Sequence, residues 1–197
     1  MREMVKMVIV LTVLSSLSGG LLAALNNTTE DRIENQVLKF VQGPAIEKIM
    51  QGADNDPVAD RFSLGVDDKE TDFFVGVFDG EPSTVALETE ASGYGGDVGV
   101  IVAIDVEKGE IFGVEITTHN ETPGVGATVE TNEDFKNQFK GMKLDGDFAV
   151  KDDDGDITAI AGATVTSRAV CKAVRRAADI YQEMRSQIND QVKTFTG

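Results

Sequence analysis

The chain begins with a long apolar segment, and the charges on its two sides differ in sign. Residues 7–25 carry no charged side chain, which is enough length to cross a bilayer as a helix. Arg2 and Lys6 precede this run, whereas Glu30 and Asp31 follow it. Because basic flanks stay in the cytoplasm, the pattern predicts a single-pass protein of the cell membrane, with a cytoplasmic N-terminus and an extracytoplasmic C-terminal domain.

A cleaved signal peptide is the alternative interpretation of this run. The run is long for a signal peptide, and Leu22-Ala23-Ala24-Leu25 is a poor small-x-small cleavage site. Both features favour a retained transmembrane anchor, which we assign to residues 1–26.

The pattern then becomes that of an amphipathic helix over about residues 29–50. Asn27 and Glu30 have the spacing of a capping box at its start, and Gly43-Pro44 should break it. Residues 52–60 are polar and rich in turn formers, which predicts a loop. We therefore expect a helical stalk and loop over residues 27–60.

Between residues 71 and 119 the pattern is that of β-strands. The predicted strands are 73–78, 84–90, 98–106 and 111–118. The third run is almost wholly apolar, which is typical of a strand buried on both faces. Asp79-Gly80 and residues 107–110 are predicted hairpin turns, and the glycine-rich residues 93–96 a flexible joint.

A helical pattern returns near the C-terminus. A set of apolar residues recurs every three or four positions and should form the buried stripe of a long helix: Val170, Val174, Ala177, Tyr181, Met184 and Ile188. Residues 157–160 precede this helix and predict a short strand. Before both, Asn132 is a predicted cap for a short helix that Gly141 ends, with two phenylalanines facing inward.

Charge and cysteine content restrict the classes of partner. The chain has 34 acidic and 18 basic residues, a net charge of -16, which argues against nucleic acid as a partner. The acidity fits a solvated domain that meets basic proteins, and equally a domain that only needs to stay soluble. Cys171 is the only cysteine, so an intramolecular disulfide is impossible and a packed thiol is expected.

Two stretches carry candidate chemistry, and the first is residues 159–167. Two small residues flank Gly162, hydroxyls follow at Thr164 and Thr166, and the long helix begins at once. A glycine turn before a helix N-terminus presents unpaired N–H groups and a positive dipole end, which suits a phosphate. It lacks the lysine of a P-loop and the further glycines of a dinucleotide fingerprint. The alternative is an ordinary helix cap made by one of the hydroxyls.

The second stretch is residues 119–126, directly after a predicted strand. His119 is the only histidine, Pro123-Gly124 predicts a turn, and Gly126 permits close approach of the backbone. A loop at a strand end is a natural ligand wall, although a polar strand end with no ligand is the simpler interpretation.

Together the two stretches, in this order, resemble the FMN-binding family that includes the RnfG protein of the Rnf electron-transport complex. The NqrC protein of the Na⁺-translocating NADH:quinone reductase is similar. In that family a flavin transferase joins FMN by a phosphoester to the last threonine of Ser/Thr-Gly-Ala-Thr-x-Thr. The resemblance implies covalent FMN on Thr166, with a cradle formed by Gly162, Ala163, Thr164 and Val165. Ala161 stands where the family usually has a hydroxyl residue, and Thr158 where it usually has an aspartate.

The same resemblance places the second stretch beside the isoalloxazine ring. The ring contacts that it implies are His119, Glu121, Thr122, Gly124 and Val125. No catalytic residue and no metal site is implied. The acidic run 152–156 resembles part of a calcium loop but lacks the closing bidentate glutamate.

For the whole chain, the resemblance implies an α+β fold: one FMN-binding domain, residues 61–197, with a mixed or antiparallel sheet flanked by helices. It implies an electron-transfer subunit of a membrane-bound, ion-translocating complex rather than a stand-alone enzyme. The expected partners are the other membrane subunits, a flavin transferase during maturation and, from the acidity, a basic cytochrome or other external redox protein. The alternatives are a membrane-anchored binding module without cofactor and a membrane-bound sensor domain with the same fold.

Overall fold

The computed structural model describes residues 2–66 and 69–195, except the side chains of Asn27, Thr28, Glu30, Asp31, Glu34 and Lys69. It contains two compact units, Met1–Phe40 and Val41–Gly197. The first consists of helix α1, Arg2–Val37, and the beginning of a π-helical turn, η1, Leu38–Gln42. The second contains the sheet and the remaining helices.

Helix α1 runs without interruption through the predicted boundary near Asn27, so the prediction of a new helix start there is wrong. The physical reason is that no glycine or proline lies between residues 21 and 42 to end a helix. The two capping-box side chains lie outside the described ones. Within α1, the segment Arg2–Asn26 is long and apolar enough to cross a membrane, and its apolar side chains are exposed as lipid contact requires.

At the predicted break, Gly43-Pro44, the chain stays helical but changes from a π-helix to an α-helix. The π-helical turn η1 leads directly into α2, Gly43–Ile49, and Pro44 lies at its first positions. Proline is tolerated there because those backbone N–H groups have no partner within the helix. Ile46 and Met50 anchor this short helix in the core, where both are almost fully buried.

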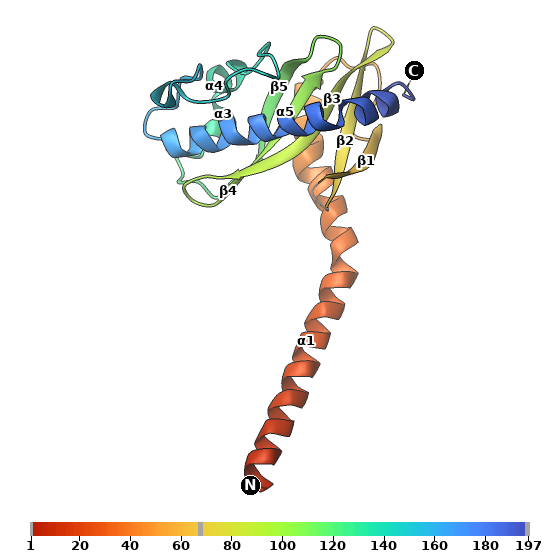
Figure 1. Ribbon diagram of the computed structural model, residues 1–197, viewed down its shortest axis with the longest axis vertical. Helices are drawn as coiled ribbons and strands as arrows, with labels where there is room; N and C mark the ends of the chain where they lie inside the picture. The colour runs from red at the N-terminus through yellow and green to blue at the C-terminus, as the bar shows by residue number, and fades with distance from the viewer. Residues whose placement is uncertain (1, 67–68, 196–197) are drawn as a thin grey trace. The chain divides into compact units, whose positions relative to one another are not determined.

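The second unit is built on one antiparallel sheet whose spatial order is the chain order, β1-β2-β3-β4-β5 (Figure 1). Its strands are β1 Arg61–Val66, β2 Lys69–Phe78, β3 Glu81–Ser92, β4 Asp97–Asp105 and β5 Glu110–Thr118. The expectation of an α+β fold is confirmed, and the sheet is antiparallel throughout. The sequence analysis missed β1, although Phe62, Leu64 and Val66 alternate with polar residues or glycine as half-buried strands do.

Both predicted hairpin turns are present. Asp79 and Gly80 have positive φ values of 53° and 77°, the geometry of the two-residue turn that matches strand twist. Gly109 has a φ of 66° in the turn between β4 and β5. Strand β4 is buried along almost its whole length, as its apolar run predicts.

Helix α5, Thr164–Val192, crosses one face of the sheet and packs on β3 and β4 (Figure 1). Its predicted stripe is confirmed: Met184 is half-buried, and the other members are buried, namely Val170, Val174, Ala177, Tyr181 and Ile188. The hydroxyl of Thr89 on β3 donates to the Ala173 carbonyl at 2.8 Å, which fixes the helix along the strand. Cys171 is buried in the same interface, and burial raises the pKa of its thiol to about 12.

The predicted strand at residues 157–160 is wrong. Only Ile157 forms a bridge, to Val150. At Thr158 the Gln138 side-chain amide takes the place of a neighbouring strand: it accepts from the Thr158 N–H at 2.8 Å and donates to its carbonyl at 3.1 Å. The backbone groups are therefore satisfied without a sheet partner.

The chain between β5 and α5 contains short helical segments. These are the helices α3 (Thr128–Thr131) and α4 (Glu133–Asn137) and the 3-10 turn η2 (Lys151–Asp153). The predicted cap is confirmed, because Asn132 accepts from the Phe135 N–H at 2.9 Å. Helix α4 ends at Asn137, before Gly141. Phe135 and Phe139 are buried and contact each other edge to face.

A charged cluster joins α2, α4 and β5. The Lys136 ammonium, only 3% exposed, lies 2.6 Å from a Glu115 oxygen and 3.0 Å from a Glu133 oxygen. It also donates to the Glu130 carbonyl at 2.9 Å. Lys48 of α2 contacts the same two carboxylates at 3.1 and 2.8 Å. The buried Lys136 ammonium group therefore compensates the negative charges of Glu115 and Glu133.

We expect Lys136→Met to lower the free energy of unfolding by about 3 kcal/mol, because the buried Glu115 carboxylate loses its shorter ion pair while the side-chain volume is kept. Thermal melting in detergent should show a drop of about 6–12 °C. The control Lys151→Met removes an exposed lysine and should leave the melting temperature nearly unchanged. Equal melting temperatures for both variants would contradict this prediction.

Candidate functional site

A cavity of about 380 Å³ lies where helix α5 begins. It is within the size range of small-molecule sites. Three segments that are far apart in the sequence form it: the loop before β4, the loop after β5, and the turn into α5. Its lining residues are Tyr94, Glu121, Thr122, Val125, Gly126 and Gly162 through Thr166.

The turn into α5 leaves backbone donors without partners. Gly162 has a φ of 79°, and Ala163 at the N-cap provides no side-chain cap. In the part of the chain that the structure describes, no acceptor lies opposite the N–H groups of Thr164, Val165 and Thr166. These residues line the cavity, so the positive end of the helix dipole adjoins it. An anionic group is the natural partner for such donors.

The hydroxyls near the turn do not act as ordinary N-caps. Ser167 accepts from the Ile160 N–H at 3.1 Å and donates to the Ala163 carbonyl at 3.0 Å, which fixes the turn from behind. Thr166 instead donates its hydroxyl to the Glu121 carboxylate across the cavity wall. The simple helix-cap interpretation therefore does not describe this N-terminus.

Glu121 connects all three segments. One of its oxygens accepts from Thr166, and the other accepts from the N–H groups of Tyr94 at 2.9 Å and Gly95 at 2.8 Å. Glu121 is only 5% exposed and Thr166 only 1%. Burial opposes ionisation of Glu121, but these hydrogen bonds and nearby His119 outweigh it, so the pKa of this carboxyl lies below its ordinary value. An ionised carboxylate therefore holds the threonine hydroxyl.

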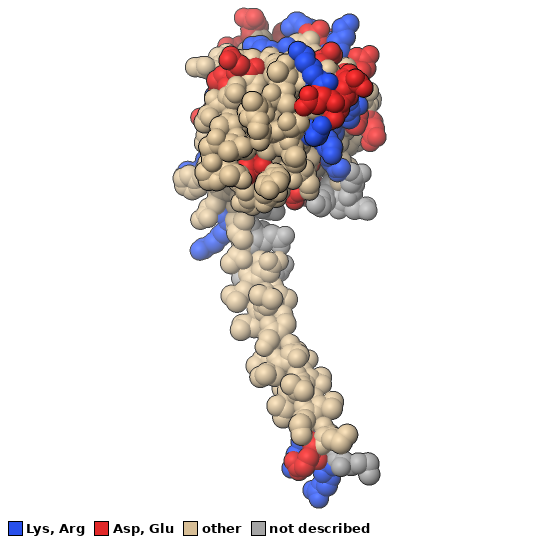
Figure 2. All heavy atoms as spheres, turned by 90° about the vertical axis from the view of Figure 1, so that its left-hand side faces the viewer, with Lys and Arg blue, Asp and Glu red and all other residues tan. Residues whose placement is uncertain are grey.

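The rest of the cavity is uncharged. Glu121 is the charged member of its lining, and the exposed apolar residues Tyr94, Val125 and Val165 also line it. Figure 2 looks onto this end of the domain: charged groups gather toward the edges of the face, and an acidic spot lies recessed in an uncharged surround. A flat apolar group could rest on such a rim while its polar end reaches the donors of α5.

Most of the residues predicted for this site line the cavity together. His119 and Gly124 do not. The His119 ring lies 3.2 Å from Glu130 and accepts from the Glu121 N–H at 3.4 Å, so it supports the loop from outside. Gly124, with a φ of 73°, shapes the loop. Their contact with a ligand ring stays a prediction.

Comparison with known proteins agrees with this geometry. The FMN-binding domain family model matches residues 93–179, which contain both stretches. The G subunit of the ion-translocating oxidoreductase complex of Shewanella oneidensis is 32% identical over 203 residues, covering 96% of this chain and 95% of the relative. That of Shewanella baltica is 34% identical over 202 residues, covering 95% and 93%. This chain belongs to the G-subunit family of ion-translocating oxidoreductase complexes.

The solved structure of NqrC from Shewanella oneidensis also resembles this G-subunit chain. It is 25% identical, with a TM-score of 0.52, and the match covers 71% of this chain and 72% of NqrC. The match agrees with the antiparallel sheet and its helices. The G-subunit chain thus contains an FMN-binding domain with this fold.

The sequence analysis missed Tyr94 and misjudged the loop around it. An added Cβ at Gly95 would lie 2.1 Å from the Asn120 carbonyl oxygen, and one at Gly93 would lie 2.5 Å from a Glu121 oxygen. Close approach of two loops, rather than flexibility, requires these glycines. An aromatic residue among glycines was the available sequence signal, and the structure shows its side chain to be exposed.

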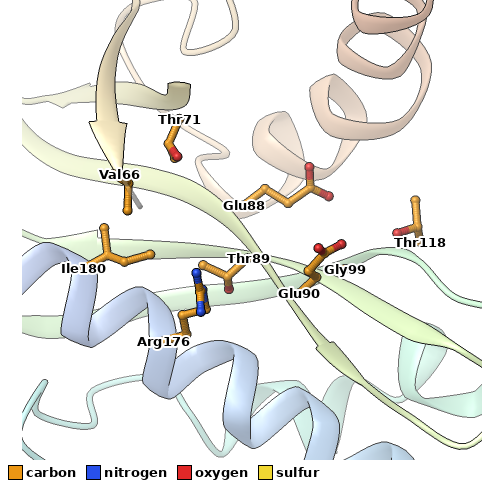
Figure 3. Close-up of a pocket in the computed structure, with 9 residues that line it drawn as sticks. All are labelled: Val66, Thr71, Glu88, Thr89, Glu90, Gly99, Thr118, Arg176 and Ile180. Carbon is orange, nitrogen blue, oxygen red and sulfur yellow. The ribbon is translucent and has the colours of Figure 1, made fainter. Parts of the chain in front are cut away.

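A second cavity of about 500 Å³ does not include any predicted site residue (Figure 3). It lies where β3 continues beyond its pairing with β2, and Arg176 and Ile180 of α5 line it. Its Glu88 carboxylate already accepts from Gln42 at 2.5 Å and from Thr117. Nothing in its lining matches the donor set at the start of α5.

We predict that Gly95→Ala destabilises the domain by about 1–3 kcal/mol, because the added Cβ meets backbone and forces the two loops apart. The melting temperature should fall by several degrees. As a control, Gly65→Ala on β1 adds a Cβ with no atom within 4 Å and should leave stability unchanged or slightly raised. A Gly95→Ala protein as stable as the control would refute the close-approach argument.

Proposed function

We propose that this chain carries FMN as a phosphoester on Thr166 and transfers electrons between protein redox centres of a membrane-bound, ion-translocating complex. The observation that carries the proposal is the position of the Thr166 hydroxyl. It lies in the wall of a cavity whose lining is uncharged apart from Glu121, at a helix N-terminus with unpaired N–H groups. Membership of the G-subunit family and the FMN-binding domain match support the same role.

The residues present fit both ends of FMN. The N–H groups of Thr164 and Val165 would hold phosphate oxygens next to the attachment point. Tyr94, Thr122 and Val125 would contact the ring along the apolar rim. FMN supplies one- and two-electron transfer when bound, while the chain sets its position and surroundings. A covalent bond would prevent loss of the cofactor.

The departures from the usual attachment motif leave this cavity intact. Ala161 is exposed and does not line it, so a missing hydroxyl there removes no contact from the wall. At Thr158 the backbone is held by Gln138, away from the lining. The motif core from Gly162 to Thr166 is complete.

We expect Thr166→Ala to abolish covalent FMN. Co-expression of the wild-type protein with a flavin transferase should add the mass of FMN less one water, and the denatured protein should fluoresce in a gel. Thr131→Ala removes an exposed hydroxyl elsewhere and should keep the label. Flavin retained on Thr166→Ala would exclude this attachment site. A wild-type protein without flavin would favour the anchored binding module.

We further propose that residues 1–26 anchor the chain, with the N-terminus in the cytoplasm and the domain outside. The basic residues Arg2 and Lys6 ahead of the apolar helix support this orientation. A flavin transferase would then act on the domain outside the cytoplasm.

Cysteine labelling tests the orientation, because the native Cys171 is buried and its thiol has a pKa raised to about 12. We expect Gln51→Cys, at an exposed position, to react with a membrane-impermeant maleimide in intact cells. Glu3→Cys should react only after the membrane is opened, and the wild-type protein should not react. The opposite pattern of labelling would reverse the proposed topology.

The electron partner outside the membrane stays a prediction. A basic cytochrome or similar protein suits the net charge of -16. Since the cavity rim is uncharged, the acidic groups would steer such a partner from a distance while apolar side chains form the contact nearest the flavin.

A further inference from the structure

We infer that Glu121 is the base that accepts the Thr166 hydroxyl proton when the flavin is attached, so that the acceptor protein supplies part of its own modification chemistry. This inference rests on the proposed attachment at Thr166. It concerns the attachment reaction and not the later transfer of electrons.

The geometry that supports it is the direct hydrogen bond from the Thr166 hydroxyl to a Glu121 oxygen. Both residues are almost fully buried, so bulk water does not surround the hydroxyl. The other Glu121 oxygen is held by the N–H groups of Tyr94 and Gly95. The carboxylate is therefore fixed in position, with one oxygen directed at the nucleophile.

A base is needed because a threonine hydroxyl is a weak nucleophile at neutral pH and is activated by an adjacent proton acceptor. Among the described residues that line the cavity, Glu121 is the only titratable group besides the Tyr94 phenol. His119 accepts from the Glu121 backbone N–H and contacts Glu130, so its ring supports the loop without touching Thr166.

Gly126 shows how closely this pair is enclosed. A Cβ at position 126 would lie 2.7 Å from the Glu121 oxygen that accepts from Thr166, and 3.0 Å from the Thr166 oxygen itself. Only glycine at this position leaves room for the hydrogen-bonded pair.

When a flavin dinucleotide is the donor, every bond that breaks in the attachment step is accounted for. The Thr166 O–H bond breaks, and its oxygen bonds to the phosphorus that bears the riboflavin part. The pyrophosphate P–O bond breaks, and AMP leaves with its electron pair. The proton passes to Glu121 and then to solvent. The N–H groups at the start of α5 would stabilise the charge on the phosphoryl oxygens.

Formation of the phosphoester should raise the pKa of the Glu121 carboxyl group, so that this group keeps the proton at first. Attachment removes the hydroxyl that donates to the carboxylate and places a phosphodiester anion beside it. Loss of a hydrogen bond to the charged form and a nearby like charge both raise a carboxyl pKa. The pair is thus arranged to receive a proton as the new bond forms.

The test measures the rate of covalent flavin incorporation into the full-length, flavin-free protein in detergent, with a flavin transferase and FAD as the donor. In-gel fluorescence of the denatured protein is the readout. We expect Glu121→Gln, which keeps the shape of the side chain but not its basicity, to be about 100-fold slower at pH 7. Glu130→Gln removes a carboxylate from nearby helix α3 and should react at the wild-type rate.

The pH dependence separates a base from a structural support. Without Glu121, hydroxide must remove the proton, so the deficit of Glu121→Gln should shrink as the pH rises from 7 to 9. A structural role gives a deficit that stays constant with pH and overturns the inference. In Glu121→Ala, added formate should restore part of the rate by taking the place of the carboxylate.

Each remaining outcome refutes either the inference about Glu121 or the proposed function. A Glu121→Gln protein that is labelled at the wild-type rate overturns the inference but leaves the attachment at Thr166 intact. If neither Glu121 variant shows a folded melting transition, the residue is a structural support and the inference fails. A wild-type protein that takes up no covalent flavin instead refutes the proposed function itself.

Discussion

The hydrogen-bonded carboxylate of Glu121 is the interaction on which the candidate site depends. It joins the loop before β4, the loop after β5 and the first turn of α5, through two backbone N–H groups and the Thr166 hydroxyl. Without an acceptor at this point, the donors of two other segments, Tyr94 and Gly95 before β4 and Thr166 in α5, would lose their partner at once. The segments that line the cavity are therefore joined by one ionised side chain.

The fold brings these segments to one end of the domain. Strands β3, β4 and β5 are sequential antiparallel neighbours, so the loop before β4 and the loop after β5 leave the same end of the sheet. Helix α5 packs on one face of the sheet, against β3 and β4, and it begins at that same end (Figure 1). Close approach then depends on site residues without a Cβ, of which Gly95 and Gly93 leave the least room.

This arrangement suits a tethered redox carrier. The unpaired donors belong to the first turn of a long helix, the apolar rim is exposed, and charged groups of both signs gather toward the edges of this face (Figure 2). A flavin held in this way would be bound at its phosphate and open along its ring, as transfer of electrons between proteins requires. The apolar helix α1 gives the G-subunit chain a candidate anchor at the membrane that its family assignment implies.

The sequence alone determined the elements whose pattern is local: the apolar run of α1, the hairpin turn at Asp79-Gly80, the buried β4 and the stripe of α5. It also indicated the two site stretches and, by resemblance, their ligand. It misplaced a helix start at Asn27 and a strand at residues 157–160, because an absent helix breaker and a distant Gln138 decided those segments. The pairing of Glu121 with Thr166, 45 residues apart, and the role of Tyr94 depended on which loops meet. Only the tertiary structure decides that, since a hydrogen bond between distant segments leaves no periodic signal in the chain.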